Sequence, residues 1–294
     1  MGTSASSKGP GGGVPMVPPW VPPIPPNSPT QDGDGDGSTG GDGLDGQSPT
    51  IPNQSTPQQP TQAPPSPIAP TARFGGARLN LGRFGQSGDR KDMQRGIGNY
   101  VRKGYGGRAT AVRRFGGTAA TAETLHGVLS SVARGQAPAP GSPFDRALLT
   151  GRSAREVMDA IIEAVRPADG TQDAEASRAA IKDALSELLT MFPDADLFNL
   201  TEDQRAMAIE RFVALDVYRR AMLDIGKAIQ DKAPTAAVAL SRLKEVKDYI
   251  KQTIAAAFRK LQSAGRHRLT MGRVNEVVRA ALDETFQVFE GYAL

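Results

Sequence analysis

The uneven distribution of proline and glycine constrains this chain more than any other feature of its sequence. Of the first 70 residues, 17 are proline and 12 are glycine, whereas only six of the 23 prolines come later. A stretch so rich in both, and so poor in aliphatic side chains, cannot bury enough surface to offset its ordering entropy. We therefore predict that residues 1–72 of the 294-residue chain form a disordered tail, and that the folded structure follows it.

The distribution of charge also sets the first part of the chain apart from the rest. Residues 1–70 carry a net charge of −4 and residues 71–117 carry +9, while the remainder is nearly neutral and the whole chain carries +4. Segregation of this kind indicates segments with different roles. We predict three parts: an acidic tail over 1–72, a basic segment rich in glycine, arginine and aromatic residues over 73–117, and an all-α body over 118–294.

The body shows the periodicity of amphipathic helices. Apolar residues recur three and four positions apart, as in Val157, Ala160 and Ile161, and no run alternates as a strand would. Ser153 with Glu156 forms a capping box at the start of that segment. Helices are predicted over about residues 119–134, 153–166, 174–192, 201–231, 235–263 and 270–290. The sequence thus predicts an all-α bundle of five to six helices.

Composition excludes several classes of site. The chain has no cysteine, which excludes disulfides, thiolate metal sites and cysteine nucleophiles and favours a reducing, cytoplasmic compartment. Its two histidines are His126, on an apolar helical stripe, and His267, in a basic turn, and we interpret both as packed or solvated. No apolar run approaches the roughly 18 residues of a membrane span, and no secretory signal is visible. We expect a cytoplasmic protein that is not an enzyme, holds no metal and needs no cofactor.

The acidic part of the tail begins like a calcium-binding loop. Aspartates alternate with glycines from Asp32 to Gly37, but the twelfth position of such a loop is Gly43, where a bidentate glutamate is required. We interpret this stretch as a solvated acidic linker.

The N-terminus offers a sterically open amine. Removal of Met1 would leave Gly2 with a free α-amine, followed by small residues from Thr3 to Ser7. The pKa of an α-amine is near 7.7–8.0, so a substantial minority is unprotonated and nucleophilic at neutral pH. Gly2 is therefore a candidate modification site. Because Ser6 completes the pattern for N-myristoylation, a lipid-anchored protein is an alternative.

Behind this amine lies a proline-rich strip that contains the only tryptophan of the chain. Prolines favour the polyproline II conformation, and a lone tryptophan outside a core serves as an anchor for a partner's pocket. A stiff spacer is the alternative. The candidate docking residues are Pro15, Pro18, Pro19, Trp20, Pro22 and Pro23.

The basic segment repeats the triplet Arg-Phe-Gly. Arginines interleaved with aromatic residues can follow a nucleic-acid backbone while the rings stack on bases. A flexible basic segment that packs on the body or on an acidic partner is the alternative. The candidate nucleic-acid contacts are Arg73, Phe74, Arg83, Phe84, Arg113, Arg114 and Phe115.

The opening MGTSxSSxGPGGGxPxVPPW, the linker, the Arg-Phe-Gly segment and the all-α end together resemble one family, QatB of the Qat bacterial anti-phage defence system. The resemblance is most specific over residues 2–26. It implies a protein that works with a QueC-like enzyme (QatC), an ATPase and a TatD-like hydrolase. Enzymes of the QueC type activate a 7-deazaguanine carboxylate with ATP, so the resemblance implies that Gly2 accepts this group. A nucleic-acid-binding adaptor stays open as the alternative function, and no membrane partner is expected.

Overall fold

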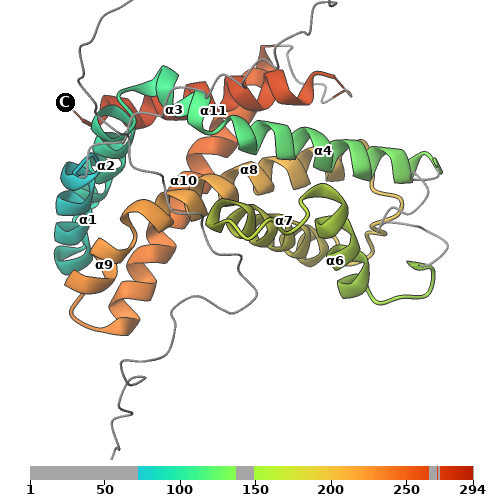
Figure 1. Ribbon diagram of the computed structural model, residues 1–294, viewed down its shortest axis with the longest axis horizontal. Coiled ribbons are helices and arrows are strands. Elements are labelled where there is room, and N and C mark those ends of the chain that lie inside the picture. Colours follow the sequence, from blue (N-terminus) through green and yellow to red (C-terminus); the bar gives the residue numbers. More distant parts are fainter. Residues whose placement is uncertain (1–71, 137–148, 265–269, 271, 294) are drawn as a thin grey trace, which may run out of the picture. The chain divides into compact units, whose positions relative to one another are not determined.

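The described part of the chain is built from helices. The computed structural model describes residues 72–136, 149–264, 270 and 272–293. These ranges contain ten α-helices, one π-helix and no β-strand, which confirms the all-α prediction (Figure 1). In chain order the elements are α1 (Gly75–Ser87), α2 (Arg90–Asn99), η1 (Tyr100–Gly104), α3 (Arg108–Arg114), α4 (Gly116–Ala133), α6 (Ala154–Val165), α7 (Gln172–Met191), α8 (Glu202–Ile225), α9 (Lys227–Lys232), α10 (Ala236–Ser263) and α11 (Val274–Gly291).

The predicted tail lies outside the described residues, together with the features that it carries. These features are Gly2, the proline and tryptophan strip, and the aspartate-rich stretch. His267 also lies outside the described residues. What the sequence indicates about them stays a prediction.

Local capping explains where the helices of the body begin. The Glu156 backbone N–H donates to the Ser153 hydroxyl at 3.3 Å, and the Ser153 backbone N–H donates to the Glu156 carboxylate at 2.9 Å. This capping box satisfies backbone donors that the first turn of a helix leaves without partners. Pro167 follows the end of the helix, which it could not continue. The helix predicted over residues 153–166 is therefore confirmed as α6.

The long helical segment predicted over residues 201–231 consists of two helices. It begins as expected, because Thr201 and Gln204 form a second capping box at the start of α8. It is then divided at Gly226, which separates α8 from the short α9. Glycine has the weakest helix propensity after proline, so an interruption at this residue fits its chemistry.

The basic segment over 73–117 is helical as well, although the sequence suggested a segment apart from the body. It forms α1, α2, η1 and α3, and its apolar side chains join the same buried cluster as those of α8 and α11. On α1, for example, the buried residues Ala77, Leu81 and Phe84 lie on one helical face. Residues 65–294 accordingly form one structural unit.

A glycine allows α1 to approach α9 closely. A Cβ placed on Gly85 would lie 2.8 Å from the backbone oxygen of Ile229 and 3.0 Å from its Cα. Any larger residue would therefore push the two helices apart. Glycines of the basic segment such as Gly85, Gly96 and Gly98, which read as a sign of flexibility in the sequence, serve here as packing surfaces.

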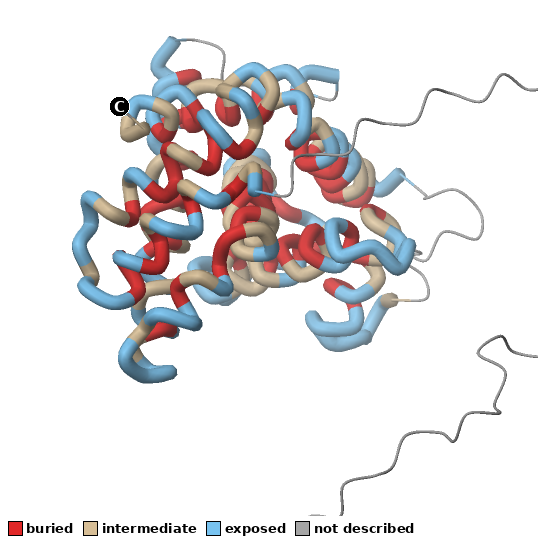
Figure 2. Tube along the Cα trace, turned by 60° about the vertical axis from the view of Figure 1, so that its left-hand side comes forward, coloured by how far each residue is buried: buried red, intermediate tan, exposed pale blue. Residues whose placement is uncertain are grey.

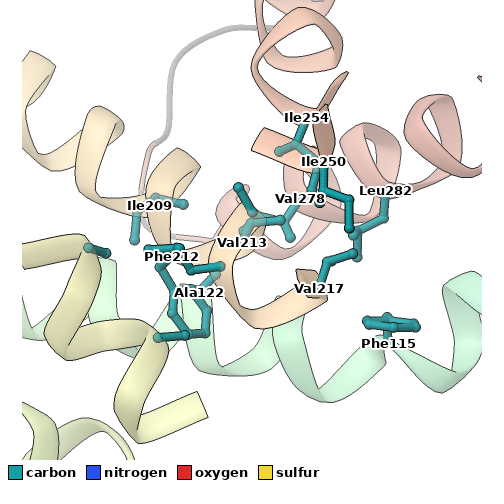
Figure 3. Close-up of a cluster of buried hydrophobic side chains, with 14 of the residues drawn as sticks. Phe115, Ala122, Ile209, Phe212, Val213, Val217, Ile250, Ile254, Val278 and Leu282 are labelled. Carbon is teal, nitrogen blue, oxygen red and sulfur yellow. The ribbon is translucent and has the colours of Figure 1, made fainter. Parts of the chain in front are cut away.

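Helix α8 supplies the centre of the core. It contacts α4, α7 and α10, and the buried residues face inward along the chain (Figure 2). Each large apolar side chain removed from water contributes about 1.5–3 kcal/mol to folding before entropy is subtracted. The central cluster is made by Phe115 and by residues of α4, α8, α10 and α11: Ala122, Ile209, Phe212, Val213, Val217, Ile250, Ile254, Val278 and Leu282 (Figure 3).

Candidate functional site

A polar hollow of about 300 Å³ lies among the end of α3, α7, α8 and two residues outside the helices, Arg73 before α1 and Tyr105 after η1. Its lining combines three arginines with two carboxylates and a phenol, and all six come from elements already fixed by the core. We call this site the polar hollow. Its polar lining residues are Arg73, Tyr105, Arg114, Asp173, Arg220 and Asp224.

Two arginines of the polar hollow have no acidic partner. The guanidinium carbon of Arg73 lies 4.4 Å from the centroid of the Phe74 ring and 5.8 Å from that of the Tyr105 ring. Stacking of this kind holds the guanidinium plane by cation–π attraction and leaves its N–H edges available. Arg114 is exposed at the end of α3. Within the ranges that the structure describes, neither arginine forms an ion pair with a carboxylate.

The third arginine of the polar hollow, Arg220, is held by two carboxylates. Arg220 Nε lies 2.9 Å from Asp216 Oδ2, and its Nη1 lies 3.2 Å from Asp173 Oδ2. Only 13% of the Arg220 side chain is exposed, and its guanidinium also lies 5.9 Å from the Phe115 ring centroid. Arg220 therefore connects the floor of the polar hollow to the interior of the helical body.

That connection ends on a fully buried carboxylate. Asp216 accepts hydrogen bonds from the Thr118 hydroxyl at 2.5 Å and from the Ser177 hydroxyl at 2.6 Å, in addition to the Arg220 contact. The four residues lie on α4, α7 and α8, so the network ties three helices together. A buried charge is tolerated when it is paired and hydrogen-bonded on all sides, as it is here.

The second carboxylate of the hollow is held by two phenols. The Tyr100 and Tyr105 hydroxyls donate to Asp224 Oδ2 at 2.9 Å and 3.2 Å. Burial raises the pKa of Tyr105 to about 12, and burial also raises the pKa of Tyr100 well above its ordinary value. Both hydroxyls therefore keep their protons at neutral pH and remain donors to Asp224.

Next to the polar hollow lies an apolar surface with Leu223 at its centre. A hollow of about 650 Å³ is lined by α1, the end of α8 and α9, and a second of about 510 Å³ lies between α7, α8 and α10. Leu223 lines both of them and the polar hollow, and it is 52% exposed. Leu79 of α1, which is 58% exposed, lines the larger hollow. We call these two leucines and the hollows around them the Leu223 surface.

Basic side chains surround the apolar part of the Leu223 surface. The larger hollow is lined by two arginines of α1 and two lysines of α9, against Asp224 and Asp231. The basic residues are Arg78, Arg83, Lys227 and Lys232. Exposed apolar residues framed by charge are typical of interaction sites.

The structure brings together only some of the candidate nucleic-acid contacts. Arg73 and Arg114 share the polar hollow, whereas Arg83 lines the larger hollow of the Leu223 surface. Arg113 is exposed elsewhere on α3, where it donates to Thr110 at 3.1 Å.

The aromatic candidates behave differently from the arginines next to them. Phe74, Phe84 and Phe115 are 4%, 0% and 1% exposed. Phe74 stacks on Tyr100, with 5.1 Å between the ring centroids, and Phe115 contacts Phe286 at 5.2 Å. The three rings are therefore part of the core and do not face solvent, where bases could stack on them.

Several residues of the site carried no signal in the sequence. Asp224, Arg220 and Leu223 belong to a helix that reads as apolar over a wide arc, and nothing in its spacing separates them from their neighbours. Tyr105 lies in the basic segment, where Tyr-Gly-Gly over residues 105–107 is similar to the repeated Arg-Phe-Gly triplet, and nothing else in the sequence distinguishes it. The hollow forms from elements distant in sequence, so only the fold assembles it.

Other candidate features stay without a site. His126 is buried on α4, as a packed histidine would be. Among the residues that the structure describes, no group of three or more potential metal ligands occurs. In the same part of the chain, every helix is too short or too polar to cross a membrane.

Comparison with known proteins gives one match. The family described as Qat anti-phage system associated protein QatB matches residues 106–289 of this chain. The matched range covers α3 to most of α11, and with them the Asp216 network, Arg114, Arg220 and Leu223. No curated protein and no solved structure gives a significant match.

Proposed function

The chain belongs to the QatB family and is a component of an anti-phage defence system, and from that premise we propose its role within the system. We propose that it is a non-enzymatic protein with two working parts. The helical body binds a QueC-like partner enzyme, and the N-terminal tail presents the Gly2 amine to that enzyme for modification. The observation that carries this proposal is the family match, which covers more than half of the chain.

The chemistry of the tail supports the second part of the role. In the modification, the unprotonated Gly2 amine attacks a 7-deazaguanine carboxylate that the partner has activated as an acyl-adenylate. The new bond is an amide, the carbon–oxygen bond to AMP breaks, and the amine gives up one proton. Small residues from Thr3 to Ser7 keep the amine accessible, and the strip from Pro15 to Pro26 offers Trp20 as an anchor beside it.

The Leu223 surface supports the first part of the role. Two half-exposed leucines lie beside hollows large enough for partner side chains, and basic residues frame them. The complementary partner surface therefore presents an apolar side chain flanked by carboxylates.

Mass spectrometry tests the modification. The full chain is expressed with active partner enzymes, and the intact mass reports whether the base is attached. Gly2→Pro replaces the primary amine by a hindered secondary one and abolishes the mass increase, whereas the control Ala5→Pro keeps the Gly2 amine and retains most of it. Trp20→Ala lowers the extent of modification without removing the acceptor. An unmodified wild-type chain in the presence of active enzymes would remove this part of the proposal.

Binding of the purified partner enzyme tests the surface. Leu223→Asp places a charge at the centre of the Leu223 surface and weakens binding by at least about tenfold, as truncated anchor residues do. The matched control is Leu240→Asp on α10, because Leu240 is 69% exposed and lines none of the hollows described above. Equal affinities of the two variants would show that the partner binds elsewhere.

The nucleic-acid adaptor stays an alternative. Its phosphate-binding arginines are at the surface, but its stacking rings are buried, so binding would depend on charge and fall steeply with salt. Replacing Arg73, Arg83, Arg113 and Arg114 together by alanine would then weaken retardation of single-stranded DNA or RNA in a gel. A wild-type chain that retards neither at low salt excludes the adaptor.

A further inference from the structure

The polar hollow holds two guanidinium groups that have no acidic partner among the described residues. Arg73 and Arg114 come from opposite ends of the basic segment, and the fold places both on the lining of one hollow. Elsewhere on the body arginines pair with carboxylates, as Arg178 does with Glu163 at 2.8 Å and Arg219 with Asp183 at 2.5 Å. The positive charge of Arg73 and Arg114 is therefore available to a ligand.

The two carboxylates of the hollow are already occupied. Asp173 accepts from Arg220, and Asp224 accepts from two tyrosine hydroxyls. Neither lies within ion-pair distance of Arg73 or Arg114 in the described ranges. Arg220 is already paired with Asp216 and Asp173, so Arg73 and Arg114 are the arginines of the lining whose charge an anion can neutralise.

Two of the three guanidinium groups are also held in place before any ligand arrives. Stacking on Phe74 and Tyr105 orients Arg73, while Asp216 and the Phe115 ring orient Arg220. Such groups lose little side-chain entropy on binding. A planar guanidinium donates two parallel hydrogen bonds, a geometry that matches the oxygens of a phosphoryl group.

We propose that the polar hollow binds a phosphoryl group, carried either by a small nucleotide or by the backbone of a nucleic acid. Its volume of about 300 Å³ lies at the lower end of the range for small-molecule sites, so one or two phosphates with part of a nucleoside would fill it. This ligand site is separate from the modification of Gly2; it adjoins the Leu223 surface and shares Leu223 and Asp224 with the larger hollow of that surface. It stands or falls independently of the proposed function.

The first test measures binding of inorganic pyrophosphate to the full chain by isothermal titration calorimetry at low salt. The variant Arg73→Gln/Arg114→Gln weakens binding by at least about tenfold, because each lost charge-assisted hydrogen bond costs a factor of roughly ten or more. The matched control is Arg95→Gln/Arg102→Gln, which removes the same charge from exposed arginines outside the hollow. The control changes affinity by less than about twofold. Circular dichroism melts verify that both double variants keep the wild-type fold.

The remaining arms identify the source of the phosphate. One-to-one binding of ADP, but not of adenosine, that is lost in Arg73→Gln/Arg114→Gln assigns the hollow to a nucleotide. Binding of a short single-stranded oligonucleotide, without ADP binding and with the same loss, assigns it to a nucleic-acid backbone. Two results overturn the proposal: no binding of any phosphate probe to the wild type, or equal weakening in both double variants, which would indicate diffuse attraction to a basic surface.

Discussion

Replacing Asp216 by alanine is the sharpest test of the buried network. The substitution removes a fully buried carboxylate and leaves the Thr118 and Ser177 hydroxyls and Arg220 Nε without their acceptor. Asp216 is 0% exposed, so water cannot take its place without opening the contact between α4, α7 and α8. The loss therefore includes the hydrogen bonds and the buried half of the Arg220 pairing, since that side chain, which is only 13% exposed, is left with the exposed Asp173.

The expected magnitude is large for one side chain. Breaking a buried ion pair by removing one partner costs about 3–5 kcal/mol. For a folded body of this size, each kcal/mol lowers the melting temperature by about 2–4 °C, so Asp216→Ala lowers it by roughly 6–20 °C. Asp216→Asn keeps one oxygen acceptor and offers an amide to the Ser177 hydroxyl, so it costs less than the alanine variant.

The same arginine supplies the control. Asp173 also pairs with Arg220, at 3.2 Å, but its side chain is 63% exposed. Exposed ion pairs contribute about 0–1 kcal/mol, so Asp173→Asn leaves stability nearly unchanged. Urea unfolding followed by the helical circular dichroism signal measures all three variants. A cost of less than about 1 kcal/mol for Asp216→Ala, or one no greater than that of Asp173→Asn, would contradict a stabilising role of the buried network.

Other perturbations address other parts of the fold. Gly85→Ala lowers the free energy of unfolding by about 1–3 kcal/mol, because the added Cβ meets the Ile229 backbone oxygen. Gly127→Ala, which has open space around it, raises the free energy of unfolding by about 0.5–1 kcal/mol. Urea melts in which both variants change stability alike would contradict this contrast. Ser153→Ala removes the cap of α6 and costs about 1 kcal/mol in the same assay, and no change would show that the box is not formed in solution. Tyr105 keeps its proton in the folded state to about pH 12 but loses it near its ordinary pKa of 10 when unfolded, so its contribution to stability is complete below pH 10 and declines from pH 10 to 12. Tyrosinate absorbance and urea melts across that interval measure this effect, and a stability that rises there would contradict the sign.

The helices of the body could be predicted because their signals are local. Capping residues, prolines and apolar side chains at helical spacing lie within each segment, and they place α6, α7 and α10 to within about two residues of the structure. The division of residues 201–231 at Gly226 was less accessible, because a single glycine inside a helical pattern is often tolerated.

The basic segment shows where local reasoning fails. Its glycines lower helix propensity, and its charge suggested a segment exposed to solvent or nucleic acid. Yet Ala77, Leu81 and Phe84 form a helical stripe, as do Met93, Ile97 and Val101, and all six are buried. The helical spacing of apolar residues was present in the sequence, but glycines interrupt it. One of them, Gly85, allows the close contact with Ile229 of α9, a helix far away in the sequence.

The candidate site was only partly accessible from the sequence for the same reason. The repeated triplet drew attention to Arg73 and Arg114, which do line one hollow. Asp224, Arg220 and Leu223 become part of the site only when the fold brings α8 beside α7 and the basic segment, and a carboxylate on a long amphipathic helix has no distinguishing pattern.

The repeated Arg-Phe-Gly triplet also has a genetic consequence. In each copy the phenylalanine enters the core while the arginine before it stays at or near the surface, so neighbouring codons control different properties. Changes at Phe74 or Phe115 are therefore visible as loss of folded protein, whereas changes at Arg73 or Arg114 leave protein levels intact and alter only what the surface binds. A mutational scan that reads abundance and phage protection separately would divide each triplet between these two classes.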